Sequence, residues 1–199
     1  LVVKLHQQQI HFDNEELLLY LEYLGTYYAL INEINEAEQY LSMALNLQKN
    51  MGITKPSILY RYAWILGKMN NNYQCINYAE EADKKYTENN NTYRSIQCKM
   101  LICIKLSEFF PKRAAQLYEE CIKIIKHSNY KDLSKIVKFN LALVYKKCKD
   151  YINSEKLLKE LITEFDNDNS NLFYVYVELV DLYILSGKHK NAIKYYNIL

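Results

Sequence analysis

The sequence predicts an all-α fold built from about five stacked helical hairpins, and three observations carry this prediction. Apolar residues recur at three- and four-residue spacing through most of the 199 residues, while strict alternation is rare. The composition is poor in residues that break helices, with four Gly and two Pro, and it contains twenty Tyr. Residues of the same kind also return every 38 to 40 positions, which is typical of a repeat architecture.

Polar clusters and turn-forming residues divide the chain into about ten helices of 12 to 18 residues. We predict a repeat domain over 13–199, preceded by a segment 1–12 that is the end of an earlier helix or a linker. The helices pair into five units, at about 15–50, 56–89, 92–128, 131–166 and 170–199. The breaks between helices fall at Asp13-Asn14, Asn32-Glu33, 50–56, 70–72, 88–92, Phe110-Pro111, 127–132, Lys149-Asp150, 166–171 and Gly187-Lys188.

One residue in each helix, small in most units, sets the register of the repeat. In the first helix of each unit these anchors are Gly25, Ala63, Ile102, Ala142 and Val180. In the second helix, twelve residues later, they are Ala37, Cys75, Ala114, Ser154 and Ala192. Successive units are 38, 39, 40 and 38 residues apart. Small anchors let the two helices of a hairpin approach closely, while large apolar neighbours fill the space between hairpins.

The best repeats carry a family resemblance. Leu24-Gly25-x-x-Tyr28 followed by Ala37 and Ala44 resembles a tetratricopeptide repeat, and so do Leu141-Ala142-x-x-Tyr145 with Tyr151 and Leu179-x-x-x-Tyr183 with Gly187 and Ala192. The resemblance covers the chain from about Glu15 onward and implies a right-handed superhelical solenoid, although the period exceeds the usual length of about 34. Long, Tyr-, Asn- and Lys-rich repeats also resemble the peptide-sensing domains of Gram-positive quorum-sensing regulators.

Composition limits the compartment and the partners. Lys and Arg number 25 against 23 for Asp and Glu, and this balance indicates no direct contact with nucleic acid. Five cysteines without metal-ligand spacing favour the reducing cytoplasm. No apolar run reaches the roughly 20 residues that span a bilayer, so no membrane partner is expected. Because the chain starts at Leu1 without Met and stops at Leu199 within a helical pattern, we expect a piece of a longer protein.

Catalysis is not expected from this sequence. The histidines are scattered, and adjacent pairs such as Glu119-Glu120 point about 100° apart on a helix rather than at one substrate. Phosphate-binding loops, nucleophile elbows and zinc motifs are absent from the sequence. We therefore predict a protein that is not an enzyme and that needs no cofactor and no metal.

Binding is the better interpretation, because the first helices of stacked hairpins line a concave wall. Counting from the anchors, we predict a ligand-binding groove formed by Tyr23, Tyr60, Arg61, Trp64, Lys68, Lys99, Cys103, Asn140, Leu143, Lys147, Glu178 and Asp181. Such a mixture of aromatic, amide and charged groups suits a short linear peptide or a protein segment. The resemblance makes Asn140 the best single candidate, since peptide-binding tetratricopeptide domains commonly present Asn at this position.

Several of these residues have a second interpretation. Asn140 is equally explained as a surface or capping residue, Arg61 as a member of a local ion pair, and Trp64 as a core aromatic. Residues 94–160 hold 15 basic and 7 acidic side chains, which could steer an anionic partner. Lysines such as Lys123 and Lys156 belong to second helices, however, and a solvated outer face explains them as well.

Two functions follow, with a third kept open. The chain is the sensor of a cytoplasmic regulator, such as a peptide-responsive transcription regulator, in which a bound peptide selects one curvature of the repeat array. Alternatively it is a constitutive scaffold for a protein partner. A regulatory subunit that inhibits an enzyme in trans is the third class. The pattern also allows a homodimer.

Overall fold

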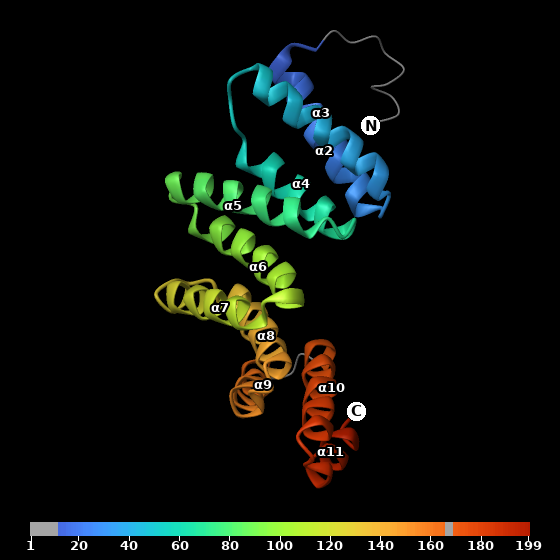
Figure 1. Cartoon of the computed structure of the whole chain (residues 1–199), viewed down its shortest axis with the longest axis vertical. Coiled ribbons are helices and arrows are strands. Elements are labelled where there is room, and N and C mark those ends of the chain that lie inside the picture. Colours follow the sequence, from blue (N-terminus) through green and yellow to red (C-terminus); the bar gives the residue numbers. More distant parts are fainter. Residues whose placement is uncertain (1–11, 166–168) are drawn as a thin grey trace. The chain divides into compact units, whose positions relative to one another are not determined.

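A computed structural model describes residues 12–165 and 169–199 and shows only α-helices in these ranges (Figure 1). The helices are α2 Asn14–Leu30, α3 Ile34–Asn50, α4 Pro56–Lys68, α5 Asn72–Glu88, α6 Thr92–Phe109, α7 Pro111–Lys126, α8 Lys131–Lys147, α9 Tyr151–Phe165, α10 Asn169–Leu185 and α11 His189–Tyr196. The all-α prediction of about ten helices is confirmed for the described part of the chain. Most of the preceding segment, residues 1–11, lies outside it, as do residues 166–168 of the break predicted at 166–171.

The predicted breaks coincide with local signals that begin and end helices. Asp13 caps α2 and forms a capping box with Glu16, whose carboxylate accepts the Asp13 N–H at 3.1 Å. Proline occupies the first turn of α4 and of α7, where its missing N–H costs nothing. After α2, α4, α5 and α8 the chain turns through a residue with positive φ, and after α3 and α10 through a glycine. The asparagines and glycines among them tolerate this conformation well.

The chain divides into two compact units, 1–102 and 103–199, and the division lies within α6. Within the first unit, α2 packs on α3, α3 on α4 and α4 on α5, and α2 also touches α4. Within the second unit each helix from α7 to α11 packs on the next, and α8 also touches α10. In each unit, therefore, first helices of successive hairpins are neighbours.

The repeat register is confirmed by burial. The anchors Ala37, Ala63 and Cys75 of the first unit have no exposed surface, nor do Ala114, Ala142 and Ser154 of the second. The Ser154 hydroxyl donates to the Ala142 carbonyl at 2.7 Å, which joins the two anchors of one hairpin directly. Among the anchors only Val180 is partly exposed. Small residues thus lie where helices come closest.

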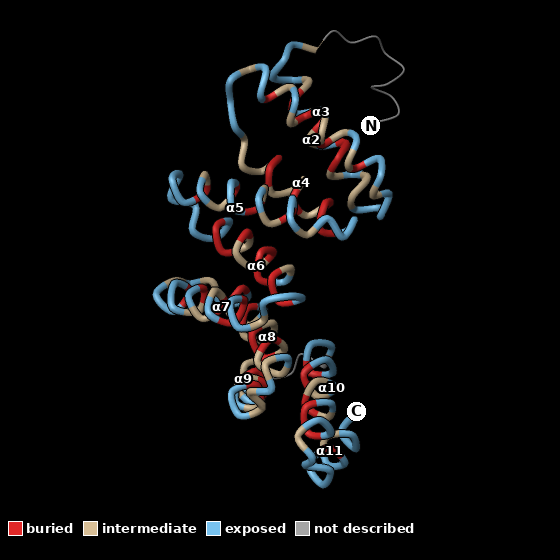
Figure 2. Tube along the Cα trace, viewed as in Figure 1, coloured by how far each residue is buried: buried red, intermediate tan, exposed pale blue. Residues whose placement is uncertain are grey.

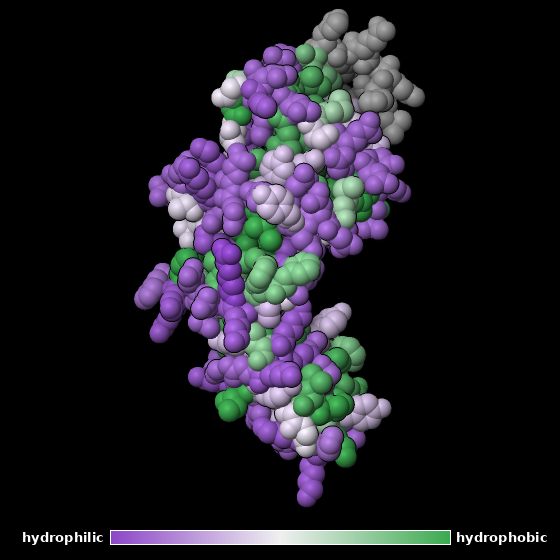
Figure 3. Space-filling view, in the orientation of Figure 1, coloured by the Kyte–Doolittle hydropathy of each residue, from purple (hydrophilic) through white to green (hydrophobic). Residues whose placement is uncertain are grey.

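Apolar cores run between the helices of each unit (Figure 2). In the first unit one cluster contains Leu18, Leu21, Ala44 and Ile58. In the second unit a larger cluster joins α8, α9, α10 and α11; its buried members are Ala142, Leu158, Leu161, Val175, Leu179, Leu182, Tyr183 and Ala192. Apolar side chains also gather on the surface of α10 and α11 (Figure 3), where Ile184, Leu185 and Ile193 are exposed.

Tyrosines fasten successive hairpins to each other. Three hydroxyls on first helices donate to a glutamate on the preceding second helix: Tyr62 to Glu38 at 2.9 Å, Tyr145 to Glu119 at 2.8 Å, and Tyr183 to Glu155 at 2.9 Å. Burial and the bond to the carboxylate raise the tyrosine pKa in all three pairs, to about 12 for Tyr183. The abundance of tyrosine therefore has a structural use.

None of the helices in the described ranges is both long enough and apolar enough to cross a bilayer.

Candidate functional site

The first unit contains a cavity of about 200 Å³ between the first helices α2 and α4. Its walls include three of the predicted groove residues, Tyr60, Arg61 and Trp64. The remaining lining residues are Gly25, Thr26, Ala29 and Leu30 from α2 and Leu41 from α3. Because Gly25 has no side chain, the backbone of α2 comes close to Leu41 and leaves a shallow apolar floor.

Charged groups surround the aromatic side of this cavity. The Lys68 ammonium lies 5.0 Å from the centre of the Trp64 ring, a cation–π contact. The Arg61 Nε donates to Glu22 Oε1 at 3.2 Å across α2 and α4. Arg61 therefore forms the local ion pair that is its alternative interpretation, although its side chain is still 40% exposed and Arg61 also lines the cavity.

Two further predicted residues of the first unit lie outside the cavity wall. Tyr23 is 63% exposed, three positions before Thr26 on the same face of α2. Lys99 on α6 is held within its unit, because its ammonium donates to Asp83 of α5 at 2.5 Å and to Ser95 of α6 at 3.1 Å. The Lys99 side chain is only 18% exposed, so its charge is already neutralised within the unit.

The prediction that Cys103 lines an open groove is wrong. Its side chain has no exposed surface, and Leu106 three positions later on α6 is also buried. In this degenerate repeat the anchor is the large Ile102, and the buried arc of α6 is wide enough to include the next position. A thiol there contributes to packing rather than to a surface that a ligand can reach.

Asn140 on α8 is half-buried and its amide is already engaged. It forms a hydrogen bond with the hydroxyl of Tyr118, which is 1% exposed. Burial raises the Tyr118 pKa, and the bond from Asn140 opposes this rise. The interpretation of Asn140 as a structural residue is therefore supported by a specific hydrogen-bond partner, the hydroxyl of Tyr118. Leu143, three positions later, is partly buried.

The acidic residues of α10 are paired with α8. Lys146 donates to Glu178 at 2.5 Å and also to Asp181. Burial would lower the Lys146 pKa, but the bonds to Asp181 and Glu178 outweigh it and raise the pKa above its ordinary value. Lys147 is exposed, and its ammonium lies 3.5 Å from the carbonyl and the hydroxyl oxygens of Ser107. Glu178 and Asp181 thus lie together around a lysine of the same chain.

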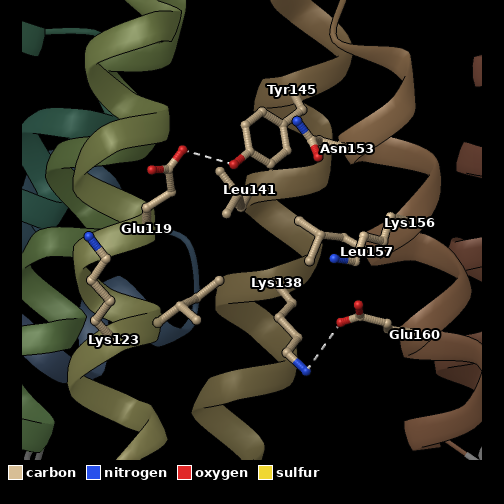
Figure 4. Close-up of a pocket in the computed structure, with 10 residues that line it drawn as sticks. Glu119, Lys123, Lys138, Leu141, Tyr145, Asn153, Lys156, Leu157 and Glu160 are labelled. Atoms are coloured by element: carbon tan, nitrogen blue, oxygen red, sulfur yellow. Dashed lines mark hydrogen bonds and ion pairs between the residues drawn. The ribbon is translucent and has the colours of Figure 1, made fainter.

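A second cavity, of about 350 Å³, was not predicted (Figure 4). It lies in the second unit among α7, α8 and α9, and all its charged residues were assigned to solvated faces or to no site. Its lining is Glu119, Ile122, Lys123, Lys138, Leu141, Tyr145, Asn153, Lys156, Leu157 and Glu160. The sequence gives no signal for it, since Lys123 and Lys156 stand at different positions of the repeat, nine residues after Ala114 and two after Ser154.

In residues 12–165 and 169–199, no three His, Cys, Asp or Glu side chains gather in a way that could hold a metal ion.

Comparison with known proteins identifies a repeat family model and several solved structures with the same fold. The tetratricopeptide repeat family model matches residues 173–197, in α10 and α11. Among solved structures, the apo form of the quorum sensor NprR from B. thuringiensis superposes with a TM-score of 0.85 at 18% identity, over 98% of this chain and 56% of that one. NprR in complex with its cognate peptide NprX gives 0.77 at 17%, over 98% and 57%.

Two other relatives have the same fold. The apo form of RapI gives a TM-score of 0.82 at 18% identity, over 98% of this chain and 56% of that one. Aspartyl phosphate phosphatase F from Bacillus subtilis gives 0.80 at 15%, over 98% and 52%. This chain thus spans about half the length of the proteins it resembles, and the predicted resemblance is confirmed at the level of fold. Among curated proteins, no sequence match is found.

Proposed function

We propose that this chain is the ligand-sensing part of a cytoplasmic regulator and that it binds a short linear peptide or an extended protein segment. The observation that carries the proposal is the α2–α4 cavity, which Tyr60, Arg61 and Trp64 line together. The structural likeness to NprR, which is known bound to its cognate peptide, supports the same class of ligand. We extend this proposal to a longer protein that contains this chain, for which we propose a role in transcription regulation.

The cavity suits one side chain of a ligand together with a nearby carboxylate. Its volume of about 200 Å³ is small for a whole ligand, and its wall combines the Trp64 and Tyr60 rings with the apolar Leu30 and Leu41. A guanidinium has five N–H donors, and the bond to Glu22 uses the one on Nε. The Nη donors of Arg61 and the ammonium of Lys68 can therefore bind a ligand carboxylate.

Binding at this position is coupled to the packing of two hairpins. Arg61 and Glu22 join α4 to α2, so a ligand carboxylate on the Nη donors binds a guanidinium whose position depends on the spacing of the two first helices. A ligand that prefers one spacing of the helices shifts the population toward it. Such a shift is the signal that an attached effector domain would read.

A constitutive scaffold is the second candidate, and the internal ion pairs favour it. Lys99 is neutralised by Asp83, and Lys146 by Glu178 and Asp181, so several predicted ligand contacts already stabilise the array. In that case the first helices form a rigid wall for a protein partner. Catalysis has no part in either candidate, and the phosphatase named among the structural relatives lends only its fold at 15% identity.

The test uses Trp64, the single tryptophan of the chain, as both target and reporter. Peptides retained by the purified protein from culture medium and lysate of its source are identified by mass spectrometry, for the wild type, Trp64→Ala and Tyr73→Ala. Tyr73 is the matched control because it is an aromatic residue on α5 that is 77% exposed and does not line the cavity. Each retained peptide is then synthesised and titrated while Trp64 emission is followed.

We expect a short peptide that is retained by the wild type and by Tyr73→Ala, is lost in Trp64→Ala, and changes the Trp64 emission. Retention of a large folded partner by all three proteins, with no change in emission, would favour the scaffold. Equal retention of one short peptide by all three would contradict the groove assignment.

A further inference from the structure

The cavity among α7, α8 and α9 lies on a different side of the repeat from the predicted groove. On α8 its lining residues are Lys138, Leu141 and Tyr145, whereas the predicted groove uses Asn140, Leu143 and Lys147. Since consecutive helical residues are about 100° apart, the two sets point to nearly opposite sides of α8. The other walls come from α7 and α9, which are second helices of their hairpins. Peptide binding by first helices leaves this cavity unused.

The centre of the cavity is apolar and its edge is charged. Leu141 and Leu157 lie in the middle of the view in Figure 4, with Glu119 and Lys123 from α7 on one side and Lys156 and Glu160 from α9 on the other. A volume of about 350 Å³ is at the lower end of ligand pockets and admits one large apolar side chain with part of its backbone.

The two carboxylates of the cavity are already engaged, and two of its lysines are not. Glu119 accepts the Tyr145 hydroxyl at 2.8 Å, and Glu160 lies 3.8 Å from the Lys138 ammonium, which also binds Glu164. Lys123 and Lys156 are exposed and have no ion-pair partner in the described part of the chain. Positive charge is thus available at both edges of an apolar centre.

The surrounding helices reinforce this charge. Counted over α7, α8 and α9, eleven side chains are basic and six are acidic. A nucleic acid brings no aliphatic side chain for the apolar centre of this cavity, and its negative charge is spread along the whole backbone. A peptide segment can place one apolar side chain in the centre and its carboxylates at the two lysines that lack an ion-pair partner.

We propose that the α7–α8–α9 cavity is a docking site for an acidic amphipathic segment of a partner protein. One large apolar side chain of the segment inserts against Ile122, Leu141 and Leu157, and aspartates or glutamates on either side of it bind Lys123 and Lys156. This is the geometry by which amphipathic segments dock into apolar grooves with a charged rim. The site is independent of the peptide groove, so the chain can hold a ligand and a protein partner at once.

The test measures the fluorescence anisotropy of a labelled synthetic peptide of about twelve residues, with a central Leu and Phe flanked by two glutamates on each side. Its counterpart carries glutamine in place of every glutamate. The protein variants are Lys123→Glu with Lys156→Glu, the milder Lys123→Gln with Lys156→Gln, and the control Lys112→Glu with Lys131→Glu. Lys112 and Lys131 are exposed, lie outside the cavity, and begin α7 and α8, where a negative charge is compatible with the helix dipole.

We expect the acidic peptide to bind the wild type with a dissociation constant in the micromolar range, weakened about tenfold or more by the double Glu variant and less by the Gln variant. The control pair should stay within about twofold of the wild type, as should Trp64→Ala, and the glutamine peptide should bind weakly. Rising salt should weaken binding because both lysines are exposed.

Three results would overturn the proposal. The first is absence of binding by the wild type, or equal affinity in all charge variants. The second is an oligonucleotide of matched length that binds more tightly than the acidic peptide and is lost in the same variants. The third is a protein that sediments as a dimer and becomes monomeric only in the Lys123 and Lys156 variants, since a second copy would then be the occupant. Circular dichroism of each variant checks that the helical fold is kept.

Discussion

Replacing Gly25 by Ala tests the close approach of the first hairpin. A Cβ built on Gly25 would lie 2.5 Å from Cγ of Leu41, 2.9 Å from its Cδ2 and 3.3 Å from its Cδ1. The branch point of the leucine, rather than a free end, meets the new methyl group. Leu41 is 1% exposed and packs with Ala37 and Ile65, so it has little room to move.

Two opposing effects set the magnitude. Alanine in a helix interior is favoured over glycine by about 1 kcal/mol. Inserting a methyl group into a packed core costs about 1 to 3 kcal/mol. With a contact at 2.5 Å the cost belongs at the upper end of this range, so we expect Gly25→Ala to lower the free energy of unfolding by about 1 to 2 kcal/mol.

Urea unfolding followed by circular dichroism measures this change, and a double-mutant cycle with Leu41→Ala locates its cause. Leu41→Ala alone should cost about 2 to 5 kcal/mol, but it also removes the atoms that clash with Ala at position 25. The double variant should therefore be more stable than the sum of the single changes predicts, by about 2 kcal/mol. A Gly25→Ala variant that is more stable than the wild type, with additive effects in the cycle, would refute the packing argument.

Three further predictions concern the second unit. Burial would raise the Glu155 pKa, but bonds from Lys159, Lys188 and Tyr183 hold it at about 2 against an ordinary 4.5, so its stabilisation is present above pH 4.5 and is lost as the pH falls toward 2. Glu155→Gln should lower the free energy of unfolding by about 1 to 2 kcal/mol at neutral pH, after allowance for the half-exposed lysines. In urea unfolding between pH 4.5 and 2, the variant should lose less stability than the wild type. Parallel curves of stability against pH for the two proteins would contradict this prediction. Ser154→Ala removes the buried hydrogen bond that the hydroxyl adds to the Ala142 carbonyl, so thermal unfolding should show a loss of about 0.5 to 1.5 kcal/mol, and an unchanged melting temperature would show that the bond contributes nothing. Cys148 is the only partly exposed cysteine of the described residues, so alkylation followed by mass spectrometry should modify it first, and early modification of a buried thiol would contradict the burial.

The fold could be predicted because its signals are local or periodic. A helix of this length needs apolar residues at three- and four-residue spacing, and its ends are fixed by residues such as Asp13, Pro56 and Gly187. The register follows from the anchors, because in most units a small residue lies where the two helices meet, as Ala142 and Ser154 do. Cys103 shows the limit of this reasoning. It occupies a repeat position that is expected to line the groove, but this degenerate repeat buries a wider arc of its helix and the Cys103 side chain is inside it.

The site was harder to predict because a repeat frame gives the direction of a side chain but not its partner. Tyr60, Arg61 and Trp64 do meet at one cavity, since their positions depend on the helix alone. Whether a charged group there is available to a ligand depends on the residue that lies opposite it on the neighbouring helix. Glu22 lies opposite Arg61, 39 positions earlier in the chain, and Lys146 lies opposite Glu178, 32 positions earlier. The units concerned are 38 residues apart in both cases, so the partners occupy non-equivalent positions of the repeat and a comparison of equivalent positions misses both pairs.

The same argument explains why the α7–α8–α9 cavity is not predicted by the sequence and why an experiment on it is the more informative one. Lys123 and Lys156 belong to different hairpins, and a count of charges on each helix assigns both to solvent. What makes them a pair is the apolar strip of α8 between them, with Leu141 at 2% exposure. A lysine at a solvated face loses nothing by pairing with a nearby glutamate, and Lys159 on the same helix α9 does so with Glu155 at 2.7 Å. Lys156, three positions earlier, faces a cavity and stays unpaired, which is the arrangement expected of a charge whose partner is on another molecule.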